Sequence, residues 1–201
     1  MLSLLLLVTA GLMALAAIAP LAARHEAGSR GVLGACTAAA VLFVGAGVGG
    51  LLGGAEALDL PFGPPWGAAR VALDGLSAWF FVILGLSGGA ASLYAFGSQH
   101  GPEAPRRLVP YPLFLAGMAL TLLAADGFTL LLGFEAMSLA SWVLVAHDHA
   151  EAENRRAARI YLGFAGFGGL SLVLACGVLA GGAGDVAFAA MREAPPEGWL
   201  A

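Results

Sequence analysis

Residues 128–146 read FTLLLGFEAMSLASWVLVA, an apolar run long enough to cross a membrane that holds one charged residue, Glu135. A transmembrane helix needs about 20 mostly apolar residues, because the hydrocarbon core of a bilayer is about 30 Å thick. Continuous apolarity without alternation favours a helix over a barrel strand. Glu135 lies ~10 Å into this run, which places its carboxyl group close to the bilayer midplane.

Further apolar runs extend this pattern over the chain, so we predict an all-α membrane protein of about six transmembrane helices. Charged residues make up only 11% of the 201 residues, against roughly a quarter in soluble domains. The run nearest the N-terminus, Leu2–Ala23, lacks the positive segment of a signal peptide and is predicted to be a retained helix. The other runs are Leu2–Ala23, Val32–Leu52, Leu76–Phe96, Leu108–Ala124 and Ala157–Leu179.

The basic residues, all of them Arg, predict how the chain crosses the membrane. Arg70 and Arg192 fall on one side, and the positive-inside rule places the seven others in the cytoplasm and the N-terminus outside. We expect a multi-pass protein of the cytoplasmic (inner) membrane of a prokaryote, with the lipid bilayer as a partner. The net charge of −4 predicts no nucleic-acid partner. The seven are Arg24, Arg30, Arg106, Arg107, Arg155, Arg156 and Arg159.

The loops divide the chain into five parts. The segment Glu56–Asp74 contains three prolines and predicts an ordered loop rather than a helix. Asp74 directly precedes the third helix, and we interpret it as the N-cap of that helix rather than a transport group. Ala125–Gly127 predicts a tight turn between the fourth and fifth helices. The parts are two N-terminal helices (1–54), an extracytoplasmic loop (55–74), the third and fourth helices (75–125), the fifth and sixth helices (126–182) and a tail (183–201).

Glycines at helical spacing predict close helix packing. On the second helix Gly45, Gly49 and Gly53 recur every four positions, and Gly85 and Gly89 do so on the third. Small residues at this spacing let helix backbones approach each other in lipid. The stretch 45–50 also fits a dinucleotide fingerprint on paper, but no strand precedes it and no acidic partner follows.

The sequence predicts no metal site and no cofactor. The cysteines, Cys36 and Cys176, lie in separate apolar runs and predict structural roles. Without Cys clusters, a haem motif or a nucleotide motif, we expect no redox chemistry in this chain.

Glu135 is the strongest candidate for a functional residue. A charged group at that depth costs about 2.5–3.5 kcal/mol on insertion scales, so it needs protonation, a cationic partner or water. A carboxyl group that loads and releases a proton is what a proton relay requires. Ser138 shares its helix face at i+3 and can hydrogen-bond either protonation state. The alternative is a protonated, structural Glu bonded to a neighbouring helix.

A polar cluster, His147, Asp148 and His149, ends the same run. His147 lies ~18 Å from Glu135 along the helix and could donate protons from the cytoplasmic side through intervening water. Alternating His residues can also bind a metal, although such residues at a loop edge are usually only solvated.

Several strings resemble a known family. The strings LDGLSAWF (73–80) and ADGFTLLLGFEAMSLASW (125–142) resemble conserved blocks of the proton-pumping, antiporter-like subunits of respiratory complex I and its relatives. His147–His149 and the string ENRRAARIY (153–161) look most like hydrogenase-4 component B and formate hydrogenlyase subunit 3, which are membrane arms of multisubunit hydrogenases. The resemblance covers roughly residues 70–180 and extends to subunits L, M and N of NADH-quinone oxidoreductase.

The resemblance implies the N-terminal part of a fourteen-helix antiporter-like fold, with Glu135 as a core proton-transfer group. In the family the matching Glu pairs with a Lys on a broken seventh helix and is tuned by the neighbouring subunit. This sequence contains no Lys and stops at Ala201, and small apolar residues around 163–169 replace a Thr-His pair of some relatives. We therefore expect a truncated or split subunit that does not complete a proton path alone.

The resemblance also implies a function. We expect a proton-translocating, non-redox subunit of a membrane-bound hydrogenase or NADH/quinone oxidoreductase, with other membrane subunits as partners. The alternatives are a multisubunit sodium/proton antiporter subunit and a non-transporting membrane scaffold.

Overall fold

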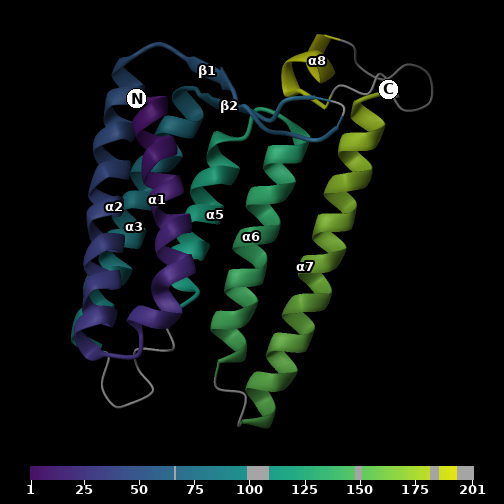
Figure 1. Cartoon of the computed structure of the whole chain (residues 1–201). Helices are drawn as coiled ribbons and strands as arrows, with labels where there is room; N and C mark the ends of the chain where they lie inside the picture. The colour runs from purple at the N-terminus through teal and green to yellow at the C-terminus, as the bar shows by residue number, and fades with distance from the viewer. Residues whose placement is uncertain (66, 99–108, 148–150, 182–185, 194–201) are drawn as a thin grey trace.

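The computed structural model describes residues 1–65, 67–98, 109–147, 151–181 and 186–193, and these form a helical bundle with one small hairpin (Figure 1). The all-α membrane architecture predicted from the sequence is confirmed. Its helices and strands are α1 (Leu2–Ala22), α2 (Glu26–Leu52), β1 (Glu56–Asp59), β2 (Arg70–Leu73), α3 (Gly75–Ser98), α5 (Tyr111–Leu123), α6 (Gly127–Ala146), α7 (Ala152–Leu179) and α8 (Phe188–Glu193).

Five helices in the described part of the chain are long and apolar enough to cross a membrane, and α5 is shorter than predicted. Its 13 residues span only ~20 Å. The helix starts after Pro110 and ends before Ala124, whose extended backbone pairs with Val71 of β2. The predicted span therefore loses its last residue to this strand-like pairing, and its first, Leu108, lies outside the described residues.

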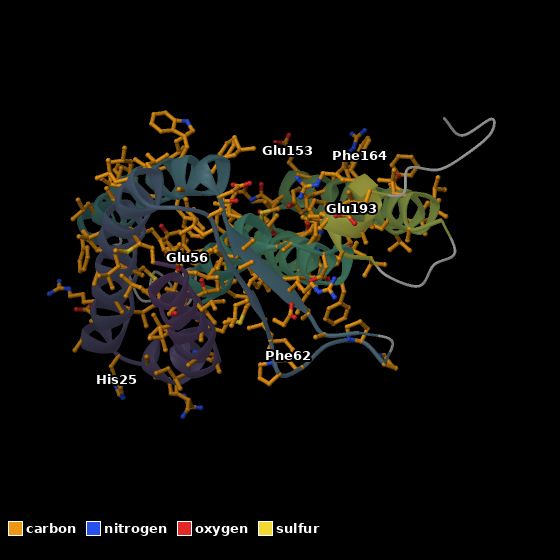
Figure 2. All side chains as sticks on the ribbon, turned by 90° about the horizontal axis from the view of Figure 1, so that it is seen from above. His25, Glu56, Phe62, Glu153, Phe164 and Glu193 are labelled. Carbon is orange, nitrogen blue, oxygen red and sulfur yellow. The ribbon has the colours of Figure 1, made fainter. Side chains whose placement is uncertain are left out.

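The helices pack side by side with α7 at one edge. Helix α2 contacts α1 and α3, α5 contacts α1 and α6, and α7 packs on α6. Only 11% of the most apolar 18-residue stretch of α7 is buried in the bundle, so most of the surface of this helix faces outward. Phe164 projects from its outer side (Figure 2). Lipid tails are as apolar as Leu, so side-chain packing rather than water exclusion must hold such helices together.

On α2, the glycines that lie against α3 differ from those predicted, whereas on α3 the predicted Gly85 lies against α2. Gly47 and Gly50 meet α3: a Cβ on Gly47 would lie 2.7 Å from the Ala78 carbonyl oxygen, whereas Gly45 has open space around it. Gly85 does lie against α2, where a Cβ would be 2.5 Å from the Ala40 carbonyl oxygen. The prediction was right for the third helix at Gly85, but on the second helix the contact face is rotated.

A two-stranded antiparallel hairpin occupies part of the predicted loop. Glu56 pairs with Leu73, and Asp59 pairs with Arg70. An ion pair of 3.3 Å joins the Arg70 and Asp59 side chains. Glu56 lies over the start of α1, where its carboxylate accepts a hydrogen bond from the Leu2 backbone N–H at 2.9 Å (Figure 2). The hairpin thereby fastens to the first helix.

The arginines separate between the two ends of the bundle. Arg70 on β2 and Arg192 on α8 lie at the end that carries the hairpin, which we call the hairpin end (Figure 1). The connection between α1 and α2 and the start of α7 form the opposite end, the arginine end. Arg106 and Arg107 lie outside the described residues. The arginine end carries Arg24, Arg30, Arg155, Arg156 and Arg159.

Candidate functional site

Glu135 lies near the middle of α6. It is eight residues past the first helical residue, Gly127, and therefore ~12 Å along a helix of ~30 Å. Its side chain is half-buried. A carboxyl group at this depth is far from either end of the helix, where water and the free backbone amides would stabilise a charge.

The Glu135 carboxyl group lies against the backbone of α7 at Gly169. A Cβ atom built on Gly169 would overlap Oε1 of Glu135 and lie 3.2 Å from its Cδ. One residue earlier, a Cβ added to Gly168 would lie 3.5 Å from the Phe134 ring. Within the described part of the chain, the Glu135 carboxyl group makes no hydrogen bond or ion pair. The carboxyl group is therefore positioned at the α6–α7 contact by close packing rather than by a hydrogen bond or an ion pair.

Ser138 follows one turn later and is buried, with 4% of its surface exposed. Among the described residues its hydroxyl has no hydrogen-bond partner, Glu135 included. Six other Ser and Thr hydroxyls in the helices donate to the carbonyl oxygen four residues back, which uses up their donor, whereas Ser3 and Ser141, like Ser138, make no such bond to the described residues. Ser138 therefore keeps a free hydroxyl donor one turn from Glu135. The hydroxyls that do bond back are Thr9, Thr37, Ser87, Ser92, Thr121 and Ser171.

His147 caps the C-terminal end of α6 and is not brought close to Glu135 by the fold. The ~18 Å between them follows from twelve helical residues. Asp148 and His149 lie outside the described residues. In the part of the chain that the structure describes, no three His, Cys, Asp or Glu side chains gather into a possible metal site.

Asp74 precedes α3 and caps it. The Ser77 backbone N–H donates to Oδ1 of Asp74 at 2.7 Å. This hydrogen bond lowers the pKa of Asp74, against desolvation, which raises it. The group lies at the hairpin end, on a different helix from Glu135.

Asp126 is a polar residue whose role the sequence analysis missed. Its side chain accepts hydrogen bonds from the Thr129 backbone N–H at 2.8 Å, the Thr129 hydroxyl at 2.7 Å and the Arg70 backbone N–H at 2.5 Å. Its backbone also pairs with Ala187, before α8. The buried carboxylate thus caps α6 and ties it to β2. An Asp three residues before a Thr at a helix start was the available signal.

A cavity of about 320 Å³ opens beside this junction, between β2, Ala124–Ala125 and the start of α8. Its charged lining comes from Asp59, Arg70, Asp74 and Arg192. The lining does not include Glu135 or Ser138, so the cavity is separate from the α6–α7 contact.

Asp126→Ala is expected to lower the free energy of unfolding by about 1–3 kcal/mol, because it removes the cap of α6 and leaves the Arg70 N–H without its acceptor. Thermal unfolding of the purified protein in detergent measures this loss. Asp59→Ala is the control, since its exposed ion pair contributes only about 0–1 kcal/mol. Equal melting temperatures for the two variants would refute the structural role of Asp126.

Comparisons with known proteins agree with the fold. A family described as NADH:quinone oxidoreductase/Mrp antiporter, TM, matches residues 124–199, which include α6 and α7. Two uncharacterized proteins of Mycobacterium tuberculosis, MT0090 (strain CDC 1551 / Oshkosh) and Rv0083 (strain ATCC 25618 / H37Rv), are each 29% identical over 151 residues. The match covers 74% of this chain but only 23% of each relative.

Two solved structures are similar over nearly the whole chain. In the archaeal membrane-bound sulfane sulfur reductase, a chain superposes with a TM-score of 0.75 and 21% identity, covering 90% of this chain and 28% of that one. In the Mrp complex from Dietzia sp. DQ12-45-1b the TM-score is 0.72 with 24% identity, covering 95% and 21%. The chain thus spans about a quarter of the length of these proteins. It shares the fold of these membrane-complex chains, and its residues 124–199 carry the sequence pattern of the NADH:quinone oxidoreductase/Mrp antiporter family.

Proposed function

We propose that this chain is a proton-translocating part of an antiporter-like subunit in a multisubunit membrane complex, and that Glu135 is its proton-transfer group. The observation that carries the proposal is the position of the Glu135 carboxyl group, half-buried at mid-helix against Gly169, with no hydrogen bond or ion pair to the described residues. Such a group can change its protonation state without breaking a structural contact.

The neighbouring residues fit this role. A proton enters on a carboxyl oxygen of Glu135, and the carboxyl group then loses its charge and the desolvation cost that comes with it. The Ser138 hydroxyl, buried one turn away, can donate to the ionised form or accept from the protonated form. His147 is positioned to exchange protons at the arginine end, ~18 Å away, through water.

The 201 residues contain no Lys, so they do not themselves supply the Lys that would stabilise ionised Glu135 in the family pattern. We further propose that the arginine end faces the cytoplasm of a prokaryote and the N-terminus faces outward, because five described arginines lie at one end.

The partner complex we propose is a membrane-bound hydrogenase or NADH/quinone oxidoreductase. The strings around 147–149 and 153–161 favour the hydrogenase-4 component B and formate hydrogenlyase type. A sodium/proton antiporter of the Mrp type is the second candidate, because the Mrp complex of Dietzia shares the fold over 95% of this chain.

Transport by the native assembly tests the proposal. The complex is purified from its own membranes, its subunits are identified by mass spectrometry, and it is placed in proteoliposomes with a pH-sensitive dye inside. Proton movement driven by a redox donor, together with hydrogenase or oxidoreductase subunits, supports the first candidate. Proton movement driven only by a sodium gradient supports the Mrp type, and no proton movement under either condition refutes the proposed function.

A further inference from the structure

Close contacts at glycines in this fold are of two kinds. At Gly117 on α5 and Gly133 on α6, an added Cβ would meet backbone: it would lie 2.5 Å from the Met137 nitrogen in one case and 2.6 Å from the Thr121 nitrogen in the other. These atoms cannot move without separating the helices. Such glycines therefore serve the packing of α5 on α6.

Gly169 on α7 is of the second kind. The atoms that an added Cβ would meet there all belong to the Glu135 side chain: Oε1, Cδ and Oε2, the last at 4.0 Å. These are the far end of a flexible side chain, which can swing away while the two helix backbones stay in place. A methyl group at this position would therefore move the carboxyl group before it disturbed the fold.

The other glycines of α7 lack this contact. Gly163, Gly166 and Gly177 have no atom within 4 Å of an added Cβ, and Gly168 makes only ordinary contact with the Phe134 ring. Gly169 is also buried, whereas Gly166 is exposed. The close contact with Glu135 is therefore specific to one position of a glycine-rich helix and does not follow from its composition.

We propose that Gly169 is a positioning residue for Glu135: because it has no side chain, α7 leaves the space in which the carboxyl group sits at the α6–α7 contact. The inference rests on the proposed role of Glu135 in proton transfer. In this proposal, contact with the α7 backbone limits where the carboxyl group can lie and so sets its distance from proton donors and acceptors. A displacement of about 1 Å in such a group can cost on the order of 100-fold in rate.

The test compares Gly169→Ala with Gly166→Ala and Gly177→Ala in the whole assembly. Ala forms helix better than Gly, so an effect on helix stability alone would favour all three variants. We expect Gly169→Ala to slow proton translocation at least tenfold and to shift the infrared band of the Glu135 carboxyl group. That band is identified as the one that Glu135→Gln removes. The two control variants should keep the wild-type rate and band.

Shortening the side chain at position 135 gives a second test, which separates loss of this contact from a general packing defect. The substitution Glu135→Asp withdraws the carboxyl group by one bond, about 1.5 Å, which relieves the overlap with a methyl group at position 169. In a Glu135→Asp background, Gly169→Ala should therefore change neither the rate nor the band further, a strong departure from additivity. If Gly169→Ala fails to assemble, the double variant should restore assembly.

The outcomes separate this inference from the proposed function. A Gly169→Ala protein with the band and rate of Gly166→Ala overturns the positioning role, as does an equal loss in the Glu and Asp backgrounds. Full transport by Glu135→Gln refutes the proposed function instead, and a band shift in Gly169→Ala would still establish the contact in that case.

Discussion

Glu135→Gln is expected to lower proton translocation by the assembled complex at least 100-fold while the complex still assembles. Gln has nearly the shape of Glu, so the contact with Gly169 and the packing of α6 on α7 stay as they are. Its amide cannot take up and release a proton, and a positioned proton-transfer group typically contributes 10²- to 10⁴-fold in rate. Dye-monitored proton uptake by proteoliposomes measures the loss.

The free energy of unfolding of Glu135→Gln should be equal to or higher than that of the wild type. The neutral amide avoids the cost of about 2.5–3.5 kcal/mol that a charge carries at mid-bilayer, so the variant should unfold no more easily than the wild type. A melting temperature equal to or above that of the wild type would exclude misfolding as the cause of lost transport.

A matched control for this substitution lies on the next helix. Glu153 is exposed in the first turn of α7, at its outer side (Figure 2). Glu153→Gln makes the same chemical change outside the apolar part of the helix and should leave the rate within about twofold, since exposed charges interact weakly. Wild-type transport in Glu135→Gln would show that protons do not pass through this residue.

The long helices were predictable because length and apolarity determine which segments can cross a membrane. The hairpin was not predicted. All four residues of β1 are exposed, so the sequence shows no apolar–polar alternation there, and the prolines between the strands indicate a loop. Helix α5 ends one residue early because Ala124 joins β2 in a pairing that spans more than 50 residues, which local sequence does not encode.

Of the two residues that form the candidate site, the sequence predicts Glu135 but not Gly169. Glu135 stands out because a carboxylate within an apolar run is costly, and that argument needs no partner. Gly169 could not be chosen among the glycines of α7, because the contact depends on how α7 is rotated and shifted along α6. The prediction for α2 failed for the same reason: sequence spacing does not show how the helix is rotated, and Gly47 and Gly50, rather than Gly45, face α3.

Gly117→Leu is expected to prevent stable packing of α5 on α6. Gly117 is buried, and an added Cβ would lie 2.5 Å from the Met137 nitrogen, 2.9 Å from its Cα and 3.0 Å from the Gly133 carbonyl oxygen. Since all three are backbone atoms, no side chain can turn aside to make room.

The expected effect grows with the size of the new side chain. Overpacking by a single methyl group costs typically about 1–3 kcal/mol, so Gly117→Ala should unfold at a clearly lower temperature than the wild type. Leu adds three further carbons at the same point, and their cost approaches the whole stability of a typical domain, about 5–15 kcal/mol. The protein level in membranes and the melting temperature of detergent extracts measure both variants.

Gly11→Leu and Gly11→Ala are the matched controls, because Gly11 is exposed on α1 and an added Cβ meets no atom within 4 Å. Leu at a lipid-facing position is as apolar as its surroundings, so both controls should accumulate and melt like the wild type. If Gly117→Leu accumulated and melted like Gly11→Leu, the close approach of α5 to α6 would be wrong. The register that places Glu135 against α7 would then lose its support, because α6 is held between the two helices.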